Sequence, residues 1–355
     1  MNTLIRAALG FHLRRRIHHV ILYVTERCPL RCRTCFVGTR APAPDPRLED
    51  VAPFLRALGP VTMVDLGGGE PFLRDDLPDW CALFPKAGNI GIPTSGWDTE
   101  VVRRVEEVLA VTGPRRLTIS VSLDGFRETN DAVRGRGTFD RALATLRALA
   151  ALPGLQVKVN TVLTRENAGE LIEFMRFIRS EAPLFHSILL LRGDPRDAEC
   201  RLPALAEVER LVPAILDIQR SYHARARGLT GRVGRNYPRL LWGVSLAALR
   251  DGRQAVPCLA GRAHLVIYAN GDVAPCELLP PVGNIHRDAP EAILKGDALR
   301  AAVRAIRAGQ CACTHNCNMV ENILFNPRTC LALLTGRWAA FIFCFDPRPP
   351  EDRET

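Results

Sequence analysis

Short apolar runs alternate with helical patterns along the first two-thirds of the chain. Between the runs, apolar residues recur at three- and four-residue spacing, as in Leu48, Val51, Leu55 and Leu58, which predicts amphipathic helices. The runs are short, apolar and closed by Gly, Ser, Thr or Pro, which predicts strands. They cover residues 18–25, 61–67, 89–94, 116–123, 156–163 and 186–192. The alternation therefore predicts six successive βα units and a parallel sheet.

Six units are too few to close an eight-stranded barrel but make most of one. We therefore predict an α/β fold, a partial (β/α)6 TIM-like barrel. In barrels of this type the chemistry lies at the rim formed by the carboxyl ends of the strands. One helix start is also predicted, at "NAGE" (167–170), with Asn167 as the N-cap and Glu170 three residues later.

The pattern changes near residue 227, where "RGLTGRVGRNYP" is rich in Gly and Arg and few long helical stripes follow. Further on, "HLVIYANGDVAPC" (264–276) predicts a hairpin that turns at Asn270–Gly271. The apolar "CLALLTGRWAAFIFCF" is interrupted by Gly336 and Arg337, so we expect a helix packed on the body rather than a membrane anchor. The expected domains are a basic N-terminal segment (1–17), the barrel (18–226), a connector (227–255), a cysteine-rich domain (256–330) and a C-terminal segment (331–355).

Composition narrows the class of protein. The chain is 47% apolar and 24% charged, which is typical of a globular protein. It contains neither a run of about 18 apolar residues nor a secretory signal, so we expect a cytoplasmic protein. The net charge of +9 would suit an anionic partner, and "RRR" at 14–16 would suit peripheral contact with a membrane or with nucleic acid. Aromatic residues are only 6% and no basic stripe carries them, so nucleic acid is not the expected partner.

Twelve cysteines change the picture more than the charge does. In a reducing compartment, clustered cysteines indicate metal binding or redox chemistry rather than disulfides. Cys81 and Cys200 stand apart, and we expect them to be buried as small apolar residues. The others form two groups, Cys28, Cys32 and Cys35, then Cys258, Cys276, Cys311, Cys313, Cys317, Cys330 and Cys344.

The first group lies in "CPLRCRTCF" (28–36), directly after the first predicted strand. Three thiolates from one loop can hold three corners of a four-iron cluster and leave the fourth iron open for a ligand. A structural zinc site would use four ligands, and no fourth Cys or His follows locally. Zinc remains the alternative at this point.

These residues resemble the C-x3-C-x-Φ-C signature of the radical S-adenosylmethionine (radical SAM) enzymes. Thr34 stands at the usually aromatic Φ position here, and the aromatic ring follows at Phe36. After the second strand, "DLGGGEPFLRDDL" (65–77) matches the family's GGE motif, which binds the amino group of S-adenosylmethionine. The resemblance spans about residues 18–330. It implies a 4Fe-4S cluster with S-adenosylmethionine, and the site residues Cys28, Cys32, Cys35, Phe36, Gly68, Gly69 and Glu70.

Other strand ends supply further candidates. Family members hold ribose, carboxylate and substrate at such positions, and each residue has an ordinary alternative as a turn or cap residue. The candidates are Ser95, Ser122, Asp124, Asn160 and Arg192.

The second group of cysteines resembles the SPASM or twitch extension of radical SAM enzymes, which opens with C-x9-15-G-x4-C and holds auxiliary iron–sulfur clusters. Cys258 and Cys276 fit this opening, whereas the later spacings depart from the full SPASM pattern. The resemblance implies at least one auxiliary cluster, held by Cys258, Cys276 and two of Cys311, Cys313 and Cys317. Cys330 is a further candidate ligand, a second cluster stays open, and a zinc ribbon is the alternative.

The resemblance also implies an activity. An electron donor such as flavodoxin or ferredoxin would drive reductive cleavage of S-adenosylmethionine to a 5′-deoxyadenosyl radical, which takes a hydrogen atom from a C–H bond. The expected substrate is a peptide or natural product, with net oxidation through the auxiliary cluster. Redox-neutral epimerisation, or dehydrogenation of a sugar, aminocyclitol or lipid-linked molecule, is the alternative.

About 17 residues precede the first strand, so a separate N-terminal peptide-recognition domain is not expected. Two other classes remain open from sequence alone. One is a nucleic-acid modifying protein, whose affinity would fall steeply with salt. The other is a zinc-stabilised protein without catalytic activity, which would not respond to S-adenosylmethionine.

Overall fold

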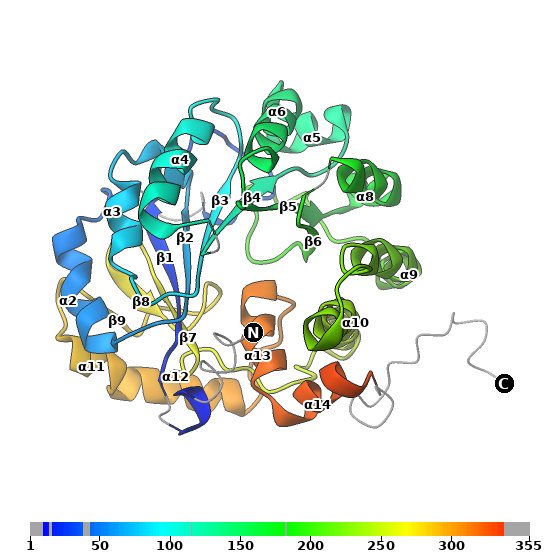
Figure 1. Cartoon of the computed structure of the whole chain (residues 1–355). Coiled ribbons are helices and arrows are strands. Elements are labelled where there is room, and N and C mark those ends of the chain that lie inside the picture. Colours follow the sequence, from blue (N-terminus) through cyan, green and yellow to red (C-terminus); the bar gives the residue numbers. More distant parts are fainter. Residues whose placement is uncertain (1–9, 14–15, 38–42, 115, 182, 337–355) are drawn as a thin grey trace.

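The structure, a computed structural model, describes residues 10–13, 16–37, 43–114, 116–181 and 183–336 (Figure 1). Its centre is one curved sheet whose strand order is β6-β5-β4-β3-β2-β1-β7-β8-β9. The sheet does not close into a barrel. The strands are β1 (His19–Thr25), β2 (Met63–Gly68), β3 (Asn89–Thr94), β4 (Leu117–Ser122), β5 (Gln156–Leu163), β6 (Phe185–Leu190), β7 (His264–Ile267), β8 (Asp272–Ala274) and β9 (Gly283–Asn284).

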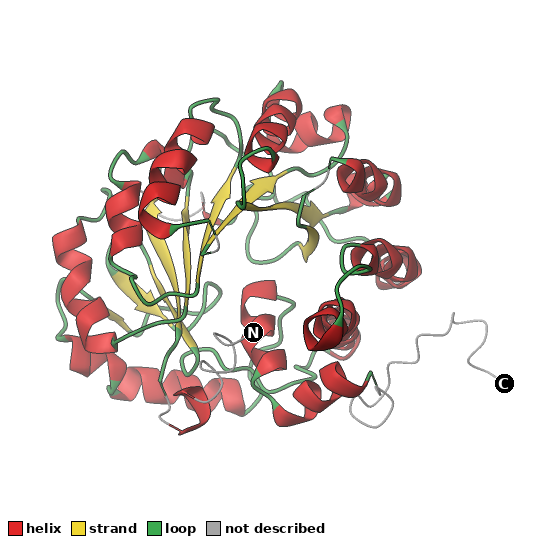
Figure 2. Ribbon diagram, viewed as in Figure 1, coloured by secondary structure: helices red, strands yellow, loops and turns green. Residues whose placement is uncertain are grey.

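The predicted α/β fold is confirmed. All six predicted strands exist, with ends that differ by at most two residues, and β1 to β6 pair in parallel in chain order. Helices cover the convex face of the sheet (Figures 1 and 2). The helices of this layer are α2 (Leu48–Leu58), α3 (Leu77–Ala82), α4 (Val101–Thr112), α5 (Arg127–Arg134), α6 (Thr138–Ala150), α8 (Leu171–Ser180) and α9 (Leu205–Ser221).

Successive side chains of β1 point to opposite faces of the sheet, so the strand contributes to two separate parts of the core. Val20, Leu22 and Val24 are fully buried against the helix layer, in the same cluster as Val51 and Phe54 of α2. Each such side chain contributes roughly 1.5–3 kcal/mol by leaving water. Ile21 and Tyr23 point the other way and pack with Val266 and Tyr268, which belong to the C-terminal third of the chain. The first strand is therefore buried on both faces.

The helix start at residue 167 was predicted wrongly. Thr164 is the N-cap of the short α7 (Arg165–Ala168), and Asn167 is its third residue, whose side-chain oxygen accepts from the Thr164 N–H at 2.9 Å. The reciprocal cap satisfies backbone groups that the helix leaves free. Asn167 also donates to the carbonyl oxygens of Asp124 and Val162, so it links α7 to the ends of β4 and β5.

The region after residue 227 also differs from its prediction. Instead of a connector with few helical stripes, α10 (Gly228–Asp251) is a 24-residue helix that packs against α9 and α14 (Pro327–Thr335). The first turns of α10 are rich in Gly and Arg and carry few apolar residues, whereas its second half is mostly buried. The first residues of the apolar stretch, 330–335, lie in α14, which packs on the body as predicted, and Asn236 of α10 donates to the Leu333 carbonyl at 2.7 Å. The part of that stretch from residue 337 on, like residues 1–9 and 14–15 of the basic start, lies outside the described residues.

The predicted hairpin is confirmed, and it joins the barrel sheet. β7 and β8 pair antiparallel around Asn270–Gly271, where Gly271 has φ +85°. β7 pairs in parallel with β1, so that His264 lies beside His19. The hairpin of the cysteine-rich region therefore belongs to the same sheet as the barrel strands. The rest of this part comprises α11 (Pro290–Leu294), α12 (Asp297–Arg307) and α13 (Asn316–Leu324).

A buried ion-pair cluster holds α13 against the concave face of the sheet, where Figure 1 shows it. The Nδ1 of His19 lies 2.5 Å from a carboxylate oxygen of Glu321, and its Nε2 lies 3.0 Å from Asp65. The second Glu321 oxygen lies 3.6 Å from His264. Burial alone would lower the pKa of His19, but the two carboxylates raise it to about 10. The charged imidazole of β1 therefore anchors α13, the helix that follows Cys313.

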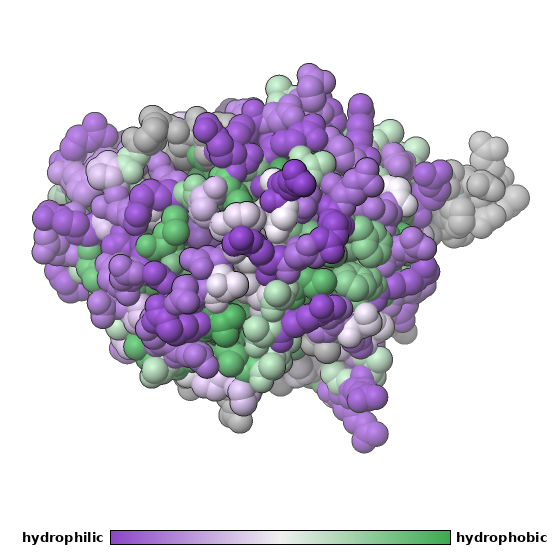
Figure 3. Space-filling model, turned by 90° about the horizontal axis from the view of Figure 1, so that it is seen from above, coloured by the Kyte–Doolittle hydropathy of each residue, from purple (hydrophilic) through white to green (hydrophobic). Residues whose placement is uncertain are grey.

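No described helix is both long and apolar enough to cross a membrane. Figure 3 shows hydrophilic residues over most of the visible face, with smaller hydrophobic areas between them.

Glu321→Gln is expected to lower the free energy of unfolding by about 3–5 kcal/mol, because it leaves the His19 charge buried with one carboxylate fewer. Guanidinium unfolding under anaerobic, reducing conditions measures this change. Glu107→Gln, which breaks an exposed pair with Arg103, is the matched control and is expected to change the free energy little. Equal effects of the two substitutions would contradict the anchoring role.

The same cluster predicts a pH dependence. His19 keeps its proton up to about pH 10 in the folded state, whereas an unfolded histidine loses it near pH 6.5. Its stabilisation is therefore complete below pH 6.5 and is lost as the pH rises toward 10. We expect unfolding free energy to fall over this window more steeply in the wild type than in His19→Gln. Parallel curves for the two proteins would refute the raised pKa.

Candidate active site

A pocket of about 430 Å³ opens at the carboxyl ends of the parallel strands. It receives residues from the loop after β1 and from the ends of β2, β3, β4 and β6. The predicted site residues that line it are Cys28, Cys32, Cys35, Phe36, Gly68, Gly69, Glu70, Ser95, Ser122 and Arg192. The rim position expected for barrel chemistry is thus occupied by most of the candidates that the sequence supplied.

The cysteine loop is fixed by backbone hydrogen bonds on two sides. The N–H of Arg33 donates to the Val133 carbonyl of α5 at 2.8 Å, and the Cys35 carbonyl accepts from the Arg196 N–H at 2.9 Å. The Arg33 guanidinium also lies 2.6 Å from Asp197. These contacts tie the loop to α5 and to the segment after β6, so its three thiols have a defined arrangement.

The three thiols are close enough to influence one another. The pKa of Cys28 is raised to about 11, mainly by burial, and the charges that Cys32 and Cys35 would carry contribute to this rise. Burial also raises the pKa of Cys32, which the nearby Arg134 guanidinium opposes. Within the described part of the chain, no three His, Cys, Asp or Glu side chains are arranged to hold a single metal ion. Three thiols that line one pocket suit a 4Fe-4S cluster as a donor set.

The neighbouring backbone leaves no room for a side chain at Gly68 or Gly69. A Cβ on Gly68 would lie 2.0 Å from the Thr25 carbonyl oxygen, and one on Gly69 would lie 2.1 Å from that of Arg27. The Gly69 and Glu70 N–H groups donate to these same two carbonyls, each at 2.8 Å. The glycines therefore let the end of β2 approach the backbone that leads into the cysteine loop, and no other residue fits there.

Glu70 is buried and faces Ser95. One carboxylate oxygen accepts from the Ser95 N–H at 2.8 Å and from its hydroxyl at 2.6 Å, and the other accepts from the Phe72 N–H. Burial raises the pKa of Glu70, and the bonds from Ser95 oppose that rise. Two of the predicted site residues thus form one unit, a carboxylate with an oriented hydroxyl at the pocket wall.

Two predicted residues lie behind the pocket rather than in its lining. Asp124 is fully buried, and its carboxylate lies 2.8 Å from Arg134 while accepting from the Val162 N–H. Arg134, which the sequence did not single out, lines the pocket in its place. Asn160 pairs in register with Ser122 and has a buried side-chain oxygen without a partner in the described part of the chain. Asp124 therefore positions a cation instead of facing a ligand.

Arg192 lies over the ring of Phe36, with 5.1 Å between its guanidinium carbon and the ring centroid. It also lies 3.8 Å from Glu277, a buried residue directly after Cys276. Glu277 accepts from the Tyr23 hydroxyl at 2.8 Å and lies 2.5 Å from His315. Burial alone would raise the pKa of Glu277, but His315 and Arg192 lower it to about 2.

Glu277 and His315 were missed because sequence gives no sign of a charge buried beside a cysteine. Their only signal is their place next to Cys276 and two residues after Cys313. They connect the pocket wall to the second group of cysteines.

Four cysteines of the second group come together beside this connection. Burial is the main cause that raises the pKa of Cys258 to about 11 and that of Cys276 to about 12. The charges that Cys311 and Cys313 would carry also raise the pKa of both thiols. Cys330 is apart, on α14, where burial alone raises its pKa. The side chain of Cys317 and the whole of Cys344 lie outside the described part of the structure. Cys81 and Cys200 are buried as expected.

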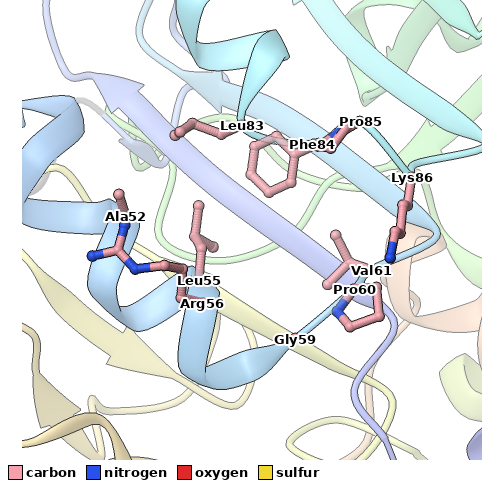
Figure 4. Close-up of a pocket in the computed structure, with 10 residues that line it drawn as sticks. All are labelled: Ala52, Leu55, Arg56, Gly59, Pro60, Val61, Leu83, Phe84, Pro85 and Lys86. Atoms are coloured by element: carbon pink, nitrogen blue, oxygen red, sulfur yellow. The ribbon is translucent and has the colours of Figure 1, made fainter.

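A second cavity of about 270 Å³ lies at the amino ends of the strands, between α2 and the loop after α3 (Figure 4). Its described lining is apolar apart from Arg56 and Lys86 and includes no cysteine or carboxylate. Because it lies at the opposite end of the strands, it is separate from the cysteine pocket.

Comparison with known proteins agrees with this geometry. Residues 22–178 match the family profile of the radical SAM superfamily, and residues 258–318 match that of the SPASM iron-sulfur cluster-binding domain. The chain is 35% identical to the mycofactocin maturase MftC of Mycobacterium tuberculosis over 158 residues, which cover 42% of this chain and only 39% of MftC. It is 24% identical to the AdoMet-dependent heme synthase of Methanosarcina barkeri over 282 residues, 75% of this chain and 78% of that protein.

The fold is also that of a solved structure. SuiB of Streptococcus suis, bound to its precursor peptide SuiA, superposes with a TM-score of 0.61 and 19% identity, over 84% of this chain and 70% of SuiB. Both profiles fall on the two cysteine groups described above, and a radical SAM domain with an SPASM domain implies a 4Fe-4S cluster with S-adenosylmethionine and auxiliary iron–sulfur clusters. The chain belongs to the radical SAM superfamily and carries a C-terminal SPASM iron–sulfur cluster-binding domain.

Proposed function

We propose that this chain is a radical SAM oxidoreductase whose 4Fe-4S cluster is held by Cys28, Cys32 and Cys35. The observation that carries the proposal is that these three thiols share one pocket with Gly68, Gly69 and Glu70, at the carboxyl ends of the strands. When bound, the cluster and S-adenosylmethionine supply a 5′-deoxyadenosyl radical that takes a hydrogen atom from an unactivated C–H bond.

The residues of the pocket have matching tasks. The buried carboxylate of Glu70, with the Ser95 hydroxyl, provides acceptors for an ammonium group. Arg134, backed by Asp124, provides a fixed positive charge beside Cys32 that suits a carboxylate. Leu189, Leu190 and Leu191 form an apolar wall that excludes water from the reacting groups. Phe36 and Ser122 also line the pocket.

We further propose that Cys258, Cys276, Cys311 and Cys313 hold one auxiliary cluster that accepts an electron from the substrate radical. The net reaction would then be an oxidation, and a reduced flavodoxin or ferredoxin would supply the first electron. The contact of Arg192 with Glu277 supports this arrangement, because it places the pocket next to the auxiliary cysteines. The fold shared with SuiB, solved with a precursor peptide, supports a peptide substrate.

The first test separates the two cysteine groups. After anaerobic reconstitution, the wild type is expected to bind about eight irons per chain and to form 5′-deoxyadenosine with dithionite and S-adenosylmethionine. Cys32→Ala is expected to form none while keeping about four irons, because its auxiliary ligands are intact. The control Cys81→Ala removes a thiol buried in the core and should retain both iron and cleavage. Loss of all iron from Cys32→Ala would mean that the two sites are not independent.

The second test assigns the auxiliary ligands. Cys313→Ala is expected to lose about four irons and still form 5′-deoxyadenosine, since it leaves the first group untouched. Cys330→Ala should bind as much iron as the wild type, because Cys330 lies apart from the other thiols on α14. Iron and sulfide counts with Mössbauer spectra measure both variants. Iron loss in Cys330→Ala but not in Cys313→Ala would reverse the assignment.

A further inference from the structure

Arg192 is a charged residue in the pocket wall to which the proposed function gives no task. Its side chain is 15% exposed and lines the pocket. Its Nε is buried and has no hydrogen-bond partner within the described part of the chain. A guanidinium in such a place retains donors for a ligand.

Its apparent counter-ion is engaged elsewhere. Glu277 lies 3.8 Å from Arg192, which is too long for a hydrogen bond. The same carboxylate has closer partners in His315 at 2.5 Å and the Tyr23 hydroxyl at 2.8 Å. Glu277 can therefore orient Arg192 without saturating its donors.

The position of Arg192 is firmly set. The Phe36 ring supports the guanidinium, and a Cβ on the following Gly193 would lie 3.3 Å from Phe36 and 3.4 Å from Leu278. The first cysteine loop, the end of β6 and the segment after Cys276 thus meet at this residue. A rotamer held by packing and stacking loses little freedom when it binds a ligand.

Two other ionic groups of the pocket, Arg134 and Glu70, already have close partners. Arg134 forms a 2.8 Å ion pair with the fully buried Asp124, and Glu70 is hydrogen-bonded to Ser95. The charge of Arg192, in contrast, reaches Cys313 and His315 on the auxiliary side. A group bound to Arg192 would lie between the two sets of cysteines, which is where a substrate that meets both must be.

We propose that Arg192 binds a carboxylate of the substrate, and that the substrate is a peptide that presents a carboxylate, of an Asp or Glu side chain or of its C-terminus, next to the reacting carbon. This rests on the proposed function and names its substrate class. The planar guanidinium matches a carboxylate with two parallel hydrogen bonds. A carboxylate brings one negative charge for the one guanidinium, whereas a phosphate monoester brings nearly two.

The test uses propionate as the simplest carboxylate with an apolar tail, and propionamide as its neutral match. Saturation-transfer difference NMR on the reconstituted full chain with S-adenosylmethionine measures binding of each probe. We expect propionate to bind and propionamide to bind at least about tenfold more weakly, since the amide loses a charge-assisted hydrogen bond. Methyl phosphate, as a third probe, is expected to bind more weakly than propionate.

Variants assign the effect to Arg192. Arg192→Gln is expected to weaken propionate binding at least about tenfold. Arg192→Lys, which keeps the charge but lacks the two parallel donors of the guanidinium, is expected to weaken it by less. Arg141→Gln is the matched control, because Arg141 also stacks on an aromatic ring, that of Trp97 at 4.1 Å, but outside the pocket. Propionate binding in the control should equal that of the wild type.

Several results would overturn the proposal. These are equal binding of propionate and propionamide by the wild type, stronger binding of methyl phosphate, or an unchanged preference in Arg192→Gln. A loss of S-adenosylmethionine affinity in Arg192→Gln as large as the loss for propionate would assign Arg192 to the cofactor instead. The wild-type comparison needs no variant to fold. Formation of 5′-deoxyadenosine by the same preparation reports separately on the proposed function.

Discussion

The pairing of β1 with strands on both of its edges is the constraint on which the site depends. β2 lies along one edge and β7 along the other, each in parallel register. The first cysteine loop leaves the end of β1, and Cys276 follows β8, the partner of β7. The relative placement of the two cysteine groups is therefore set by backbone hydrogen bonds of a sheet, which tolerate little displacement.

Buried charge is concentrated where the C-terminal third meets the concave face of the sheet. One cluster joins His19 and Asp65 to Glu321, and another joins Tyr23 and Arg192 to Glu277 and His315. Burying such groups is costly, and apolar residues in their place would often be at least as stable. What ionic contacts add is orientation, because each accepts only a few geometries. They hold the auxiliary cysteines at a defined place beside the pocket.

The sequence was sufficient for the strands and for the pocket residues with a motif, such as Cys28, Cys32, Cys35 and Glu70, because periodicity and spacing are local properties. It failed where tertiary contacts decide. Asp124 had the right place at a strand end, but Arg134, a residue of the next helix, reaches the pocket instead. α10 was missed because Gly and Arg in its first turns hide a helix that packing against α9 and α14 stabilises. Glu277 and His315 acquire their roles only when the hairpin joins β1.

The same strand order determines when the sheet can be completed during synthesis. About 240 residues separate the end of β1 from its partner β7, so at 5–20 residues per second the ribosome needs roughly 12 to 48 s to supply the second edge. Until then the N–H and C=O groups along that edge of β1 have no strand to pair with, and an open edge invites pairing with other chains. His19 has no Glu321 during this interval either. The nascent barrel is thus an unfinished sheet until β7 has been synthesised, and this stage is the one most exposed to misassembly.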